Sequence, residues 1–144
     1  MATYDNNLYY LCSLIEYIGR KTKNKRYNVV VKIGSDGLKS IYNYADVYHC
    51  EPIEAVADEM IRTYKINTSD FDNINNCLYT IPSYWQIGKV YERLIEDVSN
   101  GDVIKTLKNV YASKQSDAIS DYNSAVYYQP RSYQKACYEA NDIL

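Results

Sequence analysis

The chain has 144 residues, of which 47% are hydrophobic and 24% are charged, and its formal net charge is -2. This length suits one domain and is short for two. The apolar content and its pattern exclude a disordered tail, a collagen, a coiled coil and a transmembrane protein, and they predict a folded core.

The first half of the chain has apolar residues at helical spacing almost throughout. A first helix is predicted to begin at residue 5 or 6 and to end at Gly19. A short second helix over 24–33 is stopped by Gly34, although its three valines also fit a strand. A third helix is expected from about residue 35 to residue 48. A fourth, over 52–64, has its proline in the first turn, where a missing N–H costs nothing.

The second half begins with residues 67–82, which are rich in Asn, Asp, Ser and Thr. This composition predicts a long loop with one helical turn. Ser83 and Gln86 then match the S-x-x-Q capping box that opens a helix. A further helix is predicted over 102–122, and a last one follows the break at 127–130.

Together these elements predict an all-α fold: one compact domain, residues 1–144, of six or seven amphipathic helices. The four cysteines are scattered without a C-x-x-C pair, which favours reduced thiols over a disulfide framework. The first residues lack the basic and apolar regions of a secretory signal. We therefore expect a cytoplasmic protein that is not associated with a membrane.

The residues that carry catalysis or bind metal are few. His49 is the only histidine, and it is followed directly by Cys50. Neighbours on a helix point about 100° apart, so these two side chains cannot form a nucleophile–base pair with each other. One histidine and four scattered cysteines match no zinc site, and no phosphate-binding glycine motif is present. We expect no enzyme, cofactor or metal; an enzyme using His49 with a distant carboxylate or cysteine is the alternative.

Charge is unevenly distributed along the chain. Residues 17–35 contain six basic and no acidic side chains, whereas residues 46–72 contain seven acidic and two basic ones. A basic stretch beside two helices over 24–48 is compatible with a helix-turn-helix DNA reader. It is also compatible with a patch that pairs with the acidic region of a second copy. Nucleic-acid binding is the weaker interpretation, because Lys39 is the only basic residue in the candidate recognition helix, residues 36–48, and the net charge is negative.

Tyrosine is unusually frequent, with 18 residues against one Phe and one Trp. So many hydroxyls cannot all be buried with hydrogen-bond partners, so several rings must lie at the surface. Exposed tyrosines commonly anchor protein–protein interfaces, although a tyrosine-rich rim around the core is the alternative. The candidate partner-binding residues are Arg20, Lys21, Lys23, Lys25, Arg26, Tyr44, Tyr127, Tyr128 and Tyr133.

Residues 8–64 resemble a family of small bacterial helical proteins encoded beside ADP-ribosyltransferase-like proteins in toxin–antitoxin or defence-type operons. The resemblance is carried by Glu16-Tyr17, Val30, Ile33-Gly34, Leu38, Ile41-Tyr42, the Asp46–His49 turn and the 53–60 stretch. It implies an antitoxin or accessory role and assigns no catalytic residue. We therefore expect a non-enzymatic module that binds another protein, such as an operon-encoded toxin, or a second copy of itself.

Overall fold

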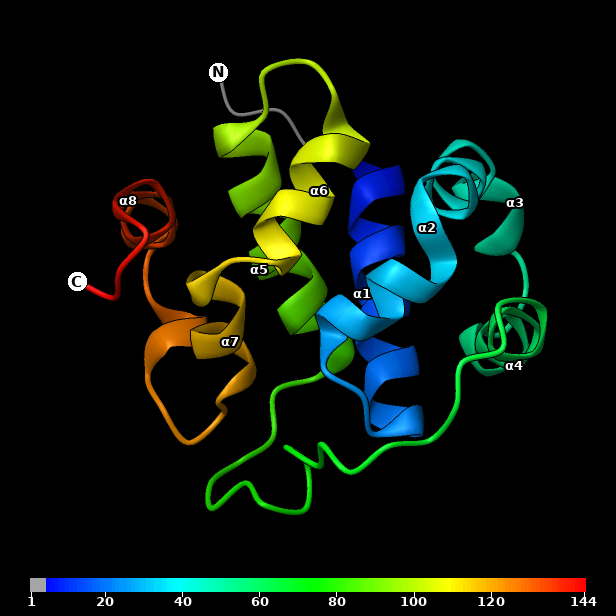
Figure 1. Ribbon diagram of the computed structural model, residues 1–144, viewed down its shortest axis with the longest axis horizontal. Coiled ribbons are helices and arrows are strands. Elements are labelled where there is room, and N and C mark those ends of the chain that lie inside the picture. The colour runs from blue at the N-terminus through cyan, green and yellow to red at the C-terminus, as the bar shows by residue number, and fades with distance from the viewer. Residues whose placement is uncertain (1–4) are drawn as a thin grey trace.

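The computed structural model describes residues 5–144, and in that part of the chain it is all-helical without strands. Helix α1 runs through the middle, with α5 and α6 on one side, α3 and α4 on the other, and α7 and α8 beyond α5 (Figure 1). The elements are α1 (Asn6–Thr22), α2 (Arg26–Asn43), α3 (Ala45–Tyr48), α4 (Ile53–Thr63), α5 (Tyr84–Val98), α6 (Val103–Tyr111), α7 (Lys114–Ser120), the 3-10 helix η1 (Val126–Tyr128) and α8 (Arg131–Ala140).

The core is centred on α1, which packs chiefly against α5 and α2. Six of its hydrophobic side chains, among them Leu8, Leu11 and Ile15, have no exposed surface. Helix α5 meets α6 through a stacked pair of buried rings, Tyr91 and Tyr111, whose centroids lie 4.1 Å apart. Burying apolar and aromatic surface in this way supplies the main driving force for folding.

The helix starts predicted at residue 5 and at Ser83 are confirmed by their caps. The Ser83 hydroxyl accepts from the Gln86 N–H at 3.1 Å, and the Gln86 side chain accepts from the Ser83 N–H at 2.7 Å. Asp5 caps α1 by accepting from the Leu8 N–H at 3.0 Å. These polar groups satisfy backbone N–H donors that have no partner within the helix.

The predicted end of the first helix at Gly19 is wrong. Helix α1 continues to Thr22, and the left-handed residue that closes it is Lys23, with φ 54°. Gly19 has a different role: a Cβ at this position would lie 2.7 Å from Nε of Arg26. Glycine therefore makes room for a buried arginine instead of ending the helix.

The helix count of six or seven is also corrected, to eight α-helices over residues 5–144. Gly34, at φ 74°, is non-helical and breaks α2 into two helical parts, as predicted, and the valines before it are helical. The predicted third helix stops at Asn43, so that α3 stands alone. The helix predicted over 102–122 divides into α6 and α7, because the Ser113 hydroxyl caps a new helix start.

None of the helices within residues 5–144 has the length and apolar character needed to cross a bilayer. All four cysteines are free; Cys12 and Cys137 are buried, and Cys50 is exposed.

Candidate functional site

A buried charged cluster lies at the C-terminal half of α1. The Glu16 carboxylate, which is 1% exposed, accepts from Arg26 Nε at 2.9 Å and from Arg20 Nε at 2.7 Å. The Tyr122 hydroxyl also donates to Glu16. Burial acts to raise the pKa of Glu16, but the two guanidinium groups outweigh it and hold this pKa at about 2. The cluster is therefore fully charged at neutral pH.

The same two arginines hold the loop that joins α4 to α5, residues 64–83. Arg26 Nη2 donates to Asn73 Oδ1 at 3.0 Å, and Arg20 Nη2 donates to the Pro82 carbonyl at 2.7 Å. Asn73 in turn donates to the carbonyl of Ser120 at 2.9 Å. The middle and the end of the loop are thus tied to α1 and α2 by charge-assisted hydrogen bonds, and the middle is tied to α7 by a neutral one.

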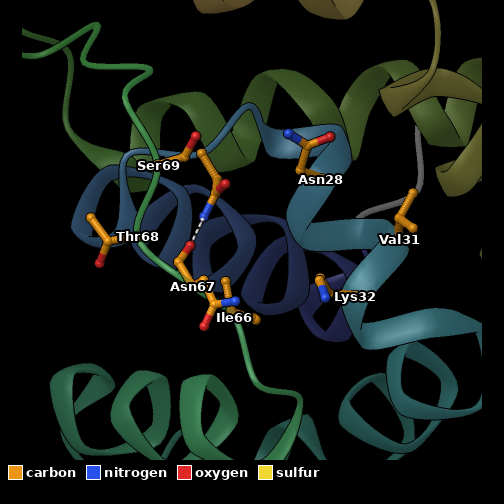
Figure 2. Close-up of a pocket in the computed structure, with 8 residues that line it drawn as sticks. Asn28, Val31, Lys32, Ile66, Asn67, Thr68 and Ser69 are labelled. Carbon is orange, nitrogen blue, oxygen red and sulfur yellow. Dashed lines mark hydrogen bonds between the residues drawn. The ribbon is translucent and has the colours of Figure 1, made fainter.

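The start of the loop is held by backbone bonds. The N–H groups of Ser69 and Phe71 donate to carbonyls at the end of α1, each at 2.9 Å. Asn24 Nδ2 donates to the Asn67 carbonyl at 2.8 Å, and both residues line a pocket of about 310 Å³ (Figure 2). Loop residues therefore satisfy the helix-end groups that α1 leaves open.

The tip of this loop is apolar and exposed. Leu78 is 81% exposed, Tyr79 69% and Ile81 40%; we call these three residues the apolar tip. Its backbone is nevertheless fixed, because Asn123 Oδ1 accepts from the Leu78 N–H at 2.7 Å and Asn123 Nδ2 donates to the Asn76 carbonyl at 3.0 Å. The loop and the segment around η1 lie at the same end of the molecule (Figure 1). The structure thus presents apolar side chains on a held backbone.

The predicted basic patch is only partly at the surface. Arg26 is 1% exposed, so the prediction that it contacts a partner is wrong: its charge neutralises Glu16 inside the protein. Arg20 lies mostly within the same cluster. Lys21 is exposed and pairs with Asp58 at 2.5 Å, Lys23 lies 3.8 Å from Asp72, and Lys25 is exposed.

The four predicted contact tyrosines are not gathered into one patch. Tyr44 and Tyr128 are 59% and 65% exposed, whereas Tyr127 and Tyr133 are half-buried. Tyr44 immediately precedes α3, which lies across α1 from the segment around η1 (Figure 1). Tyr128 belongs to η1 itself, and its ring meets that of Tyr127 edge-on at 5.0 Å.

A second pocket, of about 510 Å³, contains His49 and the only tryptophan, Trp85. We call it the aromatic pocket; its lining residues are Asn6, Asn7, Tyr9, Tyr10, Ala45, Asp46, His49 and Trp85. The His49 ring packs edge-on against Tyr10 at 5.7 Å and against Trp85 at 6.3 Å. Sequence reasoning missed this pocket, because its walls come from three helices that the spacing of apolar residues does not bring together.

No group of three or more His, Cys, Asp or Glu side chains within residues 5–144 is arranged to hold a metal ion. No protein-family model matches the chain, and no curated protein or solved structure shows significant similarity to it. The resemblance of residues 8–64 to operon-encoded helical proteins stays a prediction.

Proposed function

We propose that this protein is a non-enzymatic module that binds another protein through the apolar tip of the 64–83 loop. The observation that carries the proposal is the exposure of Leu78 at 81% and Tyr79 at 69% on a backbone held by Asn123. A pre-ordered loop loses little conformational entropy on binding, so more of the contact energy contributes to affinity.

Tyr128 supports the same reading, because it is 65% exposed and belongs to η1, and the segment around η1 lies at the same end of the molecule as the loop (Figure 1). An antitoxin or an accessory protein of a bacterial operon is the role that the resemblance of residues 8–64 favours. In that role the partner is a protein encoded in the same operon.

The test compares two double variants that each replace two exposed apolar side chains by serine. Leu78→Ser with Tyr79→Ser changes the apolar tip, and Ile143→Ser with Leu144→Ser is the matched control at the other exposed apolar pair. Wild type and both variants are used to capture proteins from a native extract, and the captured proteins are compared. We expect one partner to be retained by wild type and control and lost by the tip variant. Equal capture by all three would contradict the proposal.

A further inference from the structure

The aromatic pocket is walled by rings that face different directions. Trp85 lies 5.4 Å from Tyr9 at an interplanar angle of 54°, and 6.5 Å from Tyr10 at 52°. His49 stands at 77° to Trp85 and at 87° to Tyr10. Tyr10 is buried, whereas Tyr9 and Trp85 are half-buried and His49 is exposed, so the last three rings offer the accessible aromatic surface of the pocket. The volume, about 510 Å³, is within the range of roughly 300–1,000 Å³ found for small-molecule pockets.

The charge around this pocket is negative. Asp46 is the only carboxylate among its lining residues, and no lysine or arginine lines it. Residues 45–59, which form α3, the following turn and most of α4, contain five acidic side chains, of which Asp58 is paired with Lys21, and no lysine or arginine. Glu51 is close enough to Tyr10 to contribute, after burial, to raising the pKa of that phenol to about 12. The field of these groups favours a cation over a neutral or anionic ligand.

The polar side chains that line the pocket are Asn6, Asn7, Asp46 and His49, and Asp46 is the only carboxylate among them. The Tyr10 hydroxyl is buried and has no hydrogen-bond partner within residues 5–144. A bare ammonium group needs three acceptors to replace its water and is strongly hydrated. An alkylated ammonium group sheds its water more readily and is attracted to the faces of aromatic rings.

We propose that the aromatic pocket binds an alkylated ammonium group, with the rings of Tyr9 and Trp85 against its methyl groups and Asp46 beside its charge. Two sources share this chemistry: a free choline-type molecule and a methylated lysine side chain of a protein. The site is separate from the apolar tip, so this proposal does not rest on the proposed function.

The experiment titrates the full chain with choline, with 3,3-dimethyl-1-butanol and with a peptide containing trimethyllysine. The alcohol has the shape of choline without its charge. Binding is followed by the fluorescence of Trp85, the only tryptophan, with ionic strength matched by sodium chloride. We expect a saturable change with choline and affinity for the uncharged alcohol lower by roughly five-fold or more. Stronger binding of the peptide than of choline assigns the ligand to a protein side chain, and the reverse assigns it to a free molecule.

Two variants and a control locate the binding. Asp46→Asn keeps the size of the side chain and is expected to weaken choline about two- to three-fold without changing the alcohol. Tyr9→Leu removes one ring and is expected to weaken choline by roughly two- to five-fold. Asp70→Asn, an exposed acid of the 64–83 loop, is expected to change neither. Equal affinity for choline and the alcohol, or no saturable change with any of the three ligands, would overturn the proposal.

Discussion

The 64–83 loop rests on the buried charged cluster of Glu16, Arg20 and Arg26, which we call its base, and it ends in the exposed apolar tip. Base and tip thus reverse the usual distribution of polar and apolar side chains. At the base, Glu16 and Arg26 are each 1% exposed, whereas at the tip Leu78 is 81% exposed. Charged groups are almost never fully buried unless they are paired, and a large apolar patch at a surface is the informative exception. A buried ion pair is in general weak evidence for stability. Here Arg26 fixes the loop through Asn73, and Arg20, which pairs with the same carboxylate, fixes it through Pro82, in the position that presents the tip.

The largest expected loss of stability comes from replacing Arg26, the buried arginine of the base. Arg26→Met leaves the Glu16 carboxylate buried with less compensation and releases Asn73. We expect the free energy of unfolding to fall by about 3–5 kcal/mol, measured by urea denaturation. The matched control is Arg62→Met, an exposed arginine of α4, with a change within about 0.5 kcal/mol. Equal losses in the two variants would show that the charged cluster does not hold the base.

A second buried carboxylate sharpens the contrast, because Glu92 has no arginine bonded to it. Its Oε1 accepts from the Asp5 N–H at 3.0 Å. Burial, and to a lesser degree the neighbouring Glu96, raise the pKa of Glu92 to about 7 against the opposing effect of the Asp5 N–H. An unfolded glutamate has a pKa of about 4.3. Between these values the folded chain keeps a proton that the unfolded chain has lost, so stability falls as pH rises.

We therefore expect the free energy of unfolding to decrease by on the order of 2 kcal/mol between about pH 5 and pH 8. Glu92→Gln keeps an acceptor for the Asp5 N–H and removes the titration, so the variant should show a flatter profile. Glu16 behaves in the opposite direction: its lowered pKa gives stability that is lost only as pH falls toward about 2. Identical pH profiles for wild type and Glu92→Gln would show that Glu92 does not titrate in this range.

The contact that holds the tip is weaker than the one that holds the base. Asn123→Ala removes the bonds to the Leu78 N–H and the Asn76 carbonyl, both in an exposed part of the molecule. We expect a loss of about 1 kcal/mol and faster hydrogen exchange at the Leu78 amide. Asn109→Ala, an exposed asparagine of α6, is the control and should leave this exchange unchanged. If exchange at Leu78 is the same in all three proteins, the tip is not held by Asn123.

What the sequence predicted was mostly local. The all-α class, the caps at Asp5 and Ser83 and the loop over 67–82 follow from spacing and composition within about 20 residues, and the structure has them all. The break at Gly34 was placed correctly, although it kinks one helix. The ends of helices were less predictable. Ser113 caps α7, but nothing in the sequence distinguishes it as a cap from other serines.

The candidate site was less accessible to prediction because it depends on contacts between distant residues. The run of basic residues pointed to the right part of the chain. Nothing in it distinguishes Arg26 from Lys25, although Arg26 is buried in an ion pair with Glu16 and Lys25 is exposed. The sequence predicts a helix end at Gly19, because the need for a residue without a side chain beside Arg26 is visible only in three dimensions. The exposure of Leu78 was missed because an apolar residue in a polar loop is usually assigned to the core.

The smallest expected effect on stability is at the tip itself. Leu78→Ser removes an 81% exposed side chain, so the free energy of unfolding should stay within about 0.5 kcal/mol of wild type. Leu94→Ala, at a position with no exposed surface, is the contrasting variant and should lose about 2–5 kcal/mol. A loss of more than about 1 kcal/mol for Leu78→Ser would mean that the side chain packs against its own protein. The tip is free to act as a contact surface only if its apolar side chains contribute nothing to the fold that carries them.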